Sequence, residues 1–119
     1  MKPNDYQDWV VDNWDSAGGT NLTSRDDYIM ACGLGGECGE VLEVLKKIER
    51  DGKNPESKYF DKIQAKEMLT LELGDLLYYL TMIAARHDIP LEELMHRNVE
   101  KLTERKAAKR QKDPDLYLL

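Results

Sequence analysis

Apolar residues recur at helical spacing along most of this chain. Tyr6, Trp9 and Val10 lie three and four positions apart, and Trp14 continues the same stripe one turn later. This spacing predicts a short amphipathic helix near the N-terminus. Residues 15–23 contain two adjacent glycines and break the pattern, so we expect a loop there.

A second apolar stripe runs from about residue 25 to residue 50 and predicts a long helix. Ser24 and Asp27 precede it at the spacing of a capping box, with Asp in place of the usual Glu. Gly52 follows the last apolar position and is expected to cap the helix in a left-handed conformation.

Two further helices are expected in the second half of the chain. The third, at about residues 59–86, is apolar on nearly all sides after Asp75, so we expect it to be central and largely buried. The fourth, at about residues 91–111, follows Pro90, a residue that favours the first turn of a helix. Its second half is strongly basic and carries few apolar residues.

The sequence contains no strand pattern, so the predicted fold class is all-α. We expect a four- to five-helix, bundle-like arrangement in which the second and third helices form an antiparallel hairpin. The length of 119 residues favours one domain, residues 1–119, with its core at about residues 24–105. Residues 112–119 form a C-terminal tail that is either free or an arm over a neighbouring chain.

Two pairs of carboxylates lie within these otherwise apolar helices. Glu37 and Glu40 form one pair, Glu72 and Asp75 form the other, and each pair shares one helix face. The pairs mirror each other about the polar break at residues 51–57, so an antiparallel hairpin places Glu37 opposite Asp75 and Glu40 opposite Glu72. At ~6 Å and an effective dielectric constant of ~20, each like-charge pair costs roughly 2–3 kcal/mol. A hard divalent cation removes that cost, and ligands that are all oxygen suit Mg²⁺ or Mn²⁺.

A structural interpretation remains open, in which nearby lysines neutralise these acids. Glu43 is either an outer ligand or the partner of Lys47 in a salt bridge. An iron-carboxylate bundle is disfavoured, because such sites need Glu-x-x-His on two helices and only His96 has the required Glu. The two histidines are expected to be surface or capping residues. The lysines available to the acids are Lys46, Lys47, Lys62 and Lys66.

Four glycines crowd the helix just before and within the first acidic pair: Gly33, Gly35, Gly36 and Gly39. Each costs roughly 1 kcal/mol relative to Ala inside a helix. Either the helix breaks here, or another backbone or ligand approaches closely, and we favour close helix packing beside the acids.

Charge and cysteine content restrict the class of protein. The net charge of −6 argues against general binding to nucleic acid or to a membrane surface. The longest apolar runs are too short for a bilayer, and the N-terminus resembles no signal peptide. Cys32 and Cys38 are six residues apart in one helix, which indicates buried free thiols in a reducing compartment. We therefore expect a cytoplasmic protein.

Both acidic segments resemble the signature of the MazG-like all-α nucleoside triphosphate pyrophosphohydrolases. Residues 36–43 match the form Gly-Glu-x-Gly-Glu-hydrophobic-x-Glu, and residues 72–80 match the Glu-Leu-x-Asp-hydrophobic run with a Tyr four residues after the Asp. Residues 89–94 and 98–105 resemble the family's last helix. The resemblance covers about residues 24–105.

The resemblance implies hydrolysis of a nucleoside triphosphate, ribo or deoxy, to a monophosphate and pyrophosphate. It also implies a role in cleansing the nucleotide pool and assembly as a homodimer or homotetramer. Mg²⁺, with Mn²⁺ as a substitute, is expected at Glu37, Glu40, Glu72 and Asp75. Glu40 is the first choice for the proton acceptor, with Glu37 as its companion. Four side chains are candidates for binding the substrate: Asn98, Lys101 and Arg105 on one helix face for the phosphates, and Tyr79 for the base or sugar.

Two alternatives remain open on the sequence. One is a dUTPase-like or phosphoribosyl-ATP-type hydrolase of the same superfamily. The other is a catalytically idle helical protein that senses nucleotides or serves as a structural partner. The intact set of four acids favours an enzyme over the idle protein.

Overall fold

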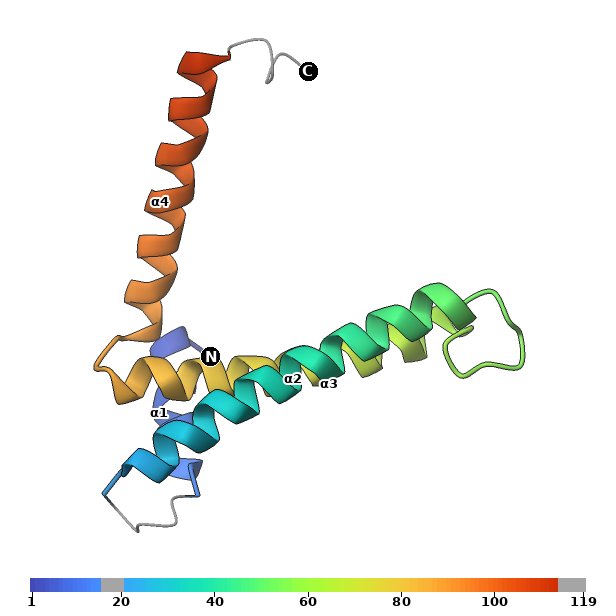
Figure 1. The fold of residues 1–119 in the computed structure, drawn as a ribbon, viewed down its shortest axis with the longest axis horizontal. Coiled ribbons are helices and arrows are strands. Elements are labelled where there is room, and N and C mark those ends of the chain that lie inside the picture. The colour runs from blue at the N-terminus through green and yellow to red at the C-terminus, as the bar shows by residue number, and fades with distance from the viewer. Residues whose placement is uncertain (16–20, 114–119) are drawn as a thin grey trace.

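The protein is all-α, as the hydrophobic pattern predicts (Figure 1). The computed structural model describes residues 1–15 and 21–113, which contain four helices and no strand. Parts of the expected loop at 15–23 and of the tail at 112–119 lie outside these described residues. The four helices are α1 (Pro3–Asn13), α2 (Ser24–Asp51), α3 (Lys62–Arg86) and α4 (Leu91–Lys112).

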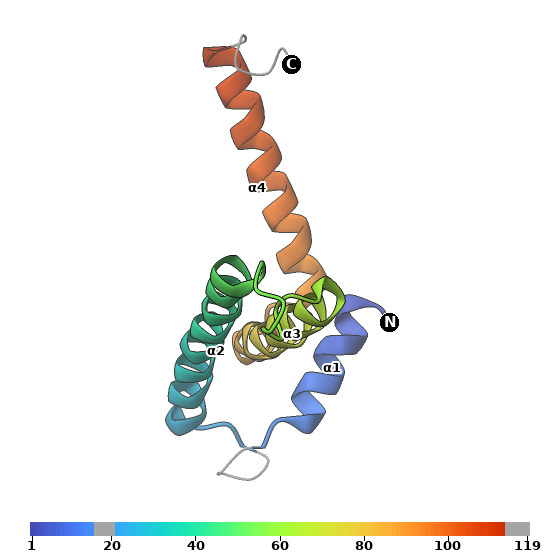
Figure 2. The ribbon, with the colours of Figure 1, turned by 90° about the vertical axis from the view of Figure 1, so that its right-hand side faces the viewer.

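An antiparallel hairpin of α2 and α3 forms the body of the molecule, which confirms the predicted hairpin (Figure 1). α3 lies between α2 on one side and α1 on the other (Figure 2). α4 leaves the end of α3 and projects away from the hairpin, contacting α1 and α3 among the described residues.

Two small apolar clusters hold the hairpin together. The first joins three helices through Val10, Met30 and Met82, all essentially inaccessible to solvent. The second lies near the hairpin turn and is built on Val44, Tyr59 and Ala65. Because the clusters lie on either side of the acidic pairs in sequence, their packing fixes the register in which those pairs face each other.

A buried carboxylate fastens the end of α1 to the start of α2. Asp26 is 1% exposed. It accepts a hydrogen bond from Trp14 Nε1 at 3.0 Å and from the backbone N–H of Thr23 at 2.8 Å. The capping box is therefore formed by Thr23 and Asp26, one residue before the expected Ser24 and Asp27. The prediction was wrong because a box built on Asp26 also accepts the Trp14 Nε1–H and so satisfies one more polar group.

The hairpin turn differs from the sequence prediction at both ends. Gly52 is not a left-handed cap, since its φ is −65°. A side chain there would collide with the carbonyl oxygen of Ile48, so close approach explains the glycine. α3 begins at Lys62 rather than near residue 59, because the Asp61 carboxylate accepts hydrogen bonds from the first backbone N–H groups. Tyr59 packs into the core cluster instead.

α3 is central but not largely buried in a single chain. Of its residues, four are buried: Ala65, Thr81, Met82 and Ala84. By length and composition alone α3 could cross a membrane, contrary to the sequence estimate, and 17% of its most apolar window is buried. A helix that packs in the core of a larger assembly meets the same criteria, so this is weak evidence for a membrane.

One buried glutamine attaches α1 to the start of α4. Gln7 donates from Nε2 to the carbonyl oxygen of Ile89, and its Oε1 accepts from the backbone N–H of Leu91, each at 2.9 Å. These bonds satisfy backbone groups in the α3–α4 turn, where Asp88 has a φ of 57°. Gln7 thereby sets the direction in which α4 leaves the body.

Replacing Gln7 is expected to destabilise this junction. Gln7→Ala leaves the buried Leu91 N–H without its partner, which costs about 1–3 kcal/mol for a buried group. The Ile89 carbonyl also loses its partner, but it is only partly buried and adds less. Urea unfolding monitored by circular dichroism measures the change. Gln64→Ala, at an exposed position of α3, is the matched control and should change stability little. Equal losses in both variants would contradict the role given to Gln7.

Candidate metal centre

Three carboxylates from two helices converge at the middle of the hairpin. Glu37 comes from α2, and Glu72 and Asp75 come from α3. One oxygen atom from each can be chosen so that all three lie within 4.8 Å of one another. Glu37 and Glu72 are half-buried, whereas Asp75 is exposed. The antiparallel register thus brings together residues 35 or more positions apart in the chain.

The electrostatic state of Glu37 reflects this crowding. Partial burial raises the pKa of the Glu37 carboxyl above its ordinary value, and the negative charges of Asp75, Glu72 and Glu40 raise it further. A hydrogen bond with the Glu72 side chain acts in the same direction. A bound cation would relieve this repulsion, and three carboxylate oxygens from two helices fit a hard divalent ion.

Glu40 lies outside the converging group. It is exposed, on the turn of α2 after Glu37, and close enough for its charge to act on Glu37. The structure therefore brings together three of the four predicted ligands and leaves Glu40 beside them. Its expected pairing with Glu72 is not among the contacts of this cluster.

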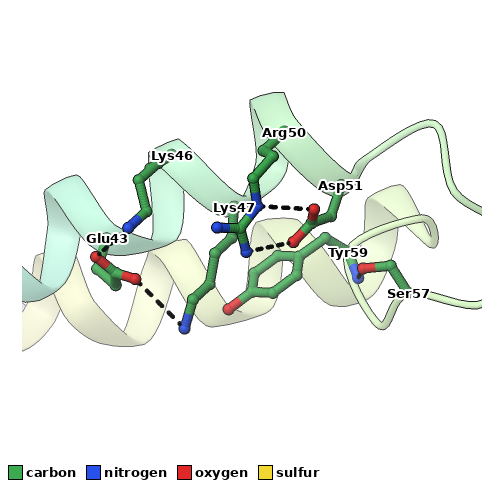
Figure 3. A network of polar contacts seen from close by, with 7 residues as sticks. All are labelled: Glu43, Lys46, Lys47, Arg50, Asp51, Ser57 and Tyr59. Atoms are coloured by element: carbon green, nitrogen blue, oxygen red, sulfur yellow. Dashed lines mark hydrogen bonds and ion pairs between the residues drawn. The ribbon is translucent and has the colours of Figure 1, made fainter.

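The lysines on α2 neutralise another acid. Glu43 forms ion pairs with Lys46 at 3.0 Å and Lys47 at 3.6 Å, while Arg50 pairs with Asp51 (Figure 3). The hydrogen bond from Lys46 lowers the pKa of Glu43. Between the two interpretations of Glu43, the ion pair agrees with the structure. Among the described residues, the ion pairs of Lys46 and Lys47 are therefore made with Glu43 and not with the three converging carboxylates.

Close helix packing accounts for one of the four glycines. Gly33 faces the ring of Tyr79, and a side-chain carbon at position 33 would overlap that ring. Gly33 and Tyr79 continue the register of Glu37 and Asp75 by one turn of each helix. Gly35, Gly36 and Gly39 face open space, so close packing does not explain them within one chain. The helix does not break at any of these positions.

The predicted phosphate ligands are not near the acids in a single chain. All three residues, Asn98, Lys101 and Arg105, are exposed on α4, which projects away from the hairpin (Figure 1). Tyr79, by contrast, lines one cavity together with Glu37 and Asp75. Tyr78 shares that cavity but was not among the predicted binding residues. Its position three residues after Asp75, on the same helix face, is the signal that could have identified it.

The histidines and cysteines, the other residue types that commonly bind metals, lie outside the carboxylate cluster. His87 is the residue that ends α3, and His96 is exposed, as expected for capping and surface residues. Cys32 and Cys38 are free, as predicted, but both are exposed rather than buried. The prediction of buried thiols was wrong, because both side chains are accessible to solvent in a single chain.

Comparison with known proteins agrees with this geometry. A family model described as "MazG nucleotide pyrophosphohydrolase domain" matches residues 28–108. The protein named "Uncharacterized protein YvdC" of Bacillus subtilis (strain 168) is 26% identical over 105 residues, covering 88% of this chain and 96% of its own length. The "Gene 37 protein" of Mycobacterium phage L5 is 35% identical over 74 residues, covering 62% of this chain and 60% of its own. No solved structure matches the chain.

The matched region contains all of the hairpin except the first four residues of α2, together with the three converging carboxylates and most of α4. The chain therefore belongs to the MazG nucleotide pyrophosphohydrolase family. α1, with its aromatic side chains, precedes the matched region.

Divalent cations are expected to stabilise the wild type more than variants of the centre. At a Mg²⁺ concentration 100-fold above the dissociation constant, binding stabilises the folded state by about 2.7 kcal/mol. Asp75→Asn should lose most of that gain, because the site loses one of three charged ligands. Thermal unfolding in EDTA measures the stability of each protein without metal, and unfolding in MgCl₂ measures the gain in stability from Mg²⁺.

The exposed Glu49→Gln change on the same hairpin serves as the control and should respond to Mg²⁺ like the wild type. Without metal, Asp75→Asn should be at least as stable as the wild type, because repulsion on Glu37 falls. A Mg²⁺ shift that is the same in all three proteins would exclude this centre.

Proposed function

We propose that this protein is a Mg²⁺-dependent pyrophosphohydrolase that cleaves nucleoside triphosphates, ribo or deoxy, into a monophosphate and pyrophosphate. Family membership supports a nucleotide substrate. The observation that carries the proposal is the convergence of Glu37, Glu72 and Asp75 across the hairpin. An acidic centre repels a polyphosphate anion unless a cation lies between them, so binding of this substrate requires a metal ion.

The donor set fits Mg²⁺, with Mn²⁺ as a substitute, because every ligand is a carboxylate oxygen. Glu37, Glu72 and Asp75 would hold the ion, and Glu40 could join them from the neighbouring turn. When bound, the ion supplies positive charge that neutralises the triphosphate and acidifies water.

The protein's own groups supply positioning and proton transfer. In the proposed reaction, the water oxygen bonds to the α-phosphorus, the bond from that phosphorus to the α–β bridging oxygen breaks, and pyrophosphate leaves with the bridging oxygen. Glu40 accepts the proton of that water. Its carboxylate is exposed and lies beside the converging group rather than within it, so it is available for this role. Glu37 assists by orienting the same water.

We further propose that the protein works as a homodimer or higher oligomer. Large apolar side chains remain exposed on the hairpin, for example Leu42 at 66% and Leu71 at 60%, more than a stable single chain needs to expose. Residues 97–112 of α4 carry a formal charge of +5, from seven basic and two acidic residues, so the rest of the chain carries −11.

The opposite charges of α4 and of the rest of the chain favour an arrangement in which α4 of one copy lies along the hairpin of another. Asn98, Lys101 and Arg105 could then reach the triphosphate, with the guanidinium and ammonium groups donating to phosphate oxygens.

The two free cysteines agree with a reducing compartment, and we propose that the protein is cytoplasmic.

Loss of the proposed proton acceptor should affect chemistry rather than folding. Glu40→Gln is expected to lower kcat by about 10²- to 10⁴-fold, the usual contribution of general acid–base catalysis. The measurement is pyrophosphate release with Mg²⁺ over a panel of canonical and modified ribo- and deoxynucleoside triphosphates that includes dUTP and phosphoribosyl-ATP. Glu49→Gln, exposed on α2, is the control.

The outcomes of this panel separate the alternatives. Activity on dUTP alone, or on phosphoribosyl-ATP alone, would favour the corresponding hydrolase of the superfamily. No release by the wild type from any substrate would favour a nucleotide-sensing or structural protein. Wild-type turnover in Glu40→Gln would overturn the role of Glu40 but not the activity.

Assembly is tested by light scattering with purified protein at micromolar concentration. The expected mass is twice 13.7 kDa or a higher multiple. Leu42→Glu together with Leu71→Glu should shift the population towards the single chain, because charges would then occupy the exposed apolar face. A wild type that scatters as a single chain at this concentration would contradict the oligomer.

A further inference from the structure

A small apolar groove lies at the foot of α4, where α2, α3 and α4 meet. Among the described residues that line it, His87 is the only polar one. The groove has a volume of about 170 Å³. Since a cavity of roughly 150 Å³ holds a benzene molecule, the groove has room for one or two apolar side chains. Its walls come from all three helices: Leu34 of α2, Leu80 and Ile83 of α3, and Leu94 of α4.

The groove is open to solvent although its lining is apolar. Leu80 is 36% exposed, and Ile89, which lines the groove from the α3–α4 turn, is 41% exposed. A second recess of similar volume shares Ile83 and His87 with the groove and continues it to Met30. The two recesses together can hold several residues of an extended segment, and covering them would remove apolar surface from water.

The chain itself carries a segment of matching chemistry after α4. Residues 113–119 read Asp-Pro-Asp-Leu-Tyr-Leu-Leu, so four large apolar side chains follow one another at positions 116–119. These four positions, which we call the apolar run, lie outside the described residues. Because a large apolar side chain left in water forgoes the free energy of burial, we expect the apolar run to be covered by another surface.

The length of α4 keeps the apolar run away from the groove of its own chain. Leu94 lies in the first turn of α4 and Lys112 ends the helix, which separates them by about 27 Å at 1.5 Å per residue. Residues 113–119 span at most about 25 Å, even if fully extended and directed straight back along α4. The apolar run therefore cannot fill this groove in its own chain, whereas the groove of a second copy is not subject to this limit.

One other apolar strip, on α4 itself, lies within reach of the apolar run. It consists of Val99 and Leu102, flanked by Arg105, Lys106 and Lys109. The described residues that line it all come from α4. A single helix provides one wall, so an apolar segment buries less surface there than in a groove between three helices. The groove of a second copy is therefore the more favourable site.

The dimensions of the helices agree with such an exchange. α4 has 22 residues and is about 33 Å long, and α2 has 28 residues and is about 42 Å long. If α4 of one copy lies along the hairpin of another and points towards the α1 end, its last turn stops within reach of the partner's groove. Two-fold symmetry makes the exchange reciprocal, so that each copy gives one apolar run and receives one.

We infer that the apolar run, residues 116–119, docks into the groove of a second copy of the chain. The inference rests on the proposed assembly but not on the proposed hydrolysis, and it names the segment that joins the copies. α4 would then be fastened at both ends, by Gln7 at its foot and by the apolar run beyond Lys112. A helix held at both ends keeps its exposed polar side chains at a fixed place over the partner.

The direct test is a photochemical crosslink from the apolar run. Tyr117→p-benzoylphenylalanine in the full chain introduces a photoreactive ketone and keeps an aromatic ring at this position. After irradiation, denaturing electrophoresis measures the mass of the adduct, and mass spectrometry of its peptides locates the attachment. The expected adduct has twice the mass of 13.7 kDa, and its attachment lies at Leu34, Leu80, Ile83 or Leu94.

A charge in the groove should remove this adduct. Leu80→Asp in the photoreactive chain is expected to abolish it, because the apolar run would have to bury a carboxylate. Ile63→Asp is the matched control at a site that is 83% exposed, and it should keep the adduct. If Leu80→Asp fails to fold by circular dichroism, Ile89→Asp, at the rim of the groove, takes its place with the same expectation.

The contribution of the apolar run to assembly is measured separately. Leu118→Asp is expected to raise the dissociation constant of the assembly by about tenfold or more, the factor for one leucine that is no longer buried. Light scattering over a dilution series gives this constant. Leu118→Met keeps the volume and the apolar character of the side chain, so it should leave the constant nearly unchanged.

Three results would overturn the inference. They are an adduct with the mass of a single chain attached at Val99 or Leu102, an adduct to any other part of a second copy, and an assembled protein that forms no adduct. A wild type that scatters as a single chain would remove the proposed assembly together with this inference. Failure of the proposed hydrolysis shows independently, as a protein that forms the expected adduct but releases no pyrophosphate.

Discussion

The register of α2 against α3 is the constraint on which the other features depend. Two separate apolar clusters, one at the α1 end and one at the hairpin turn, fix this register from both sides of the acids. Glu37 then meets Asp75, and Gly33 meets Tyr79 one turn further along. Because both contacts follow from one alignment, a shift of a single turn would separate the carboxylates and force Tyr79 against a different side chain. The carboxylate cluster and the position of the Tyr79 ring are consequently set by the same packing.

The body supports this hairpin with few buried groups. Asp26 and Gln7 are polar, yet each is satisfied by hydrogen bonds that tie α1 to the helices after it. Such groups fix directions that apolar contacts leave adjustable, since a hydrogen bond constrains angle as well as distance. α1 is thereby held against α3, where its rings extend the surface that begins at Tyr78.

Sequence reasoning predicted the parts of the structure that repeat locally. The helices, the hairpin and the opposition of Glu37 and Asp75 follow from periodicity and from distance to the turn. It failed where several neighbours compete, as at the cap, where Asp26 rather than Asp27 turns inward to meet Trp14. It also failed to place α4, because the direction of a helix after a turn depends on contacts such as that of Gln7 with the Ile89 carbonyl. The ring contacts of Trp14 with Tyr78 and Tyr79 were not predicted, because these residues lie more than 60 positions apart in the chain.

The glycines at 35, 36 and 39 give α2 an uneven local stability. They face open space, so no packing offsets a helix penalty of roughly 1 kcal/mol for each. The turn that carries Glu37 is therefore the part of α2 that opens most readily, and its amide protons should exchange sooner than those near Val44. A cation held by both helices requires that this turn of α2 is helical. Cation binding and the ordering of this turn would therefore be thermodynamically coupled. The affinity of the candidate centre for a cation would thus depend partly on residues outside its set of ligands.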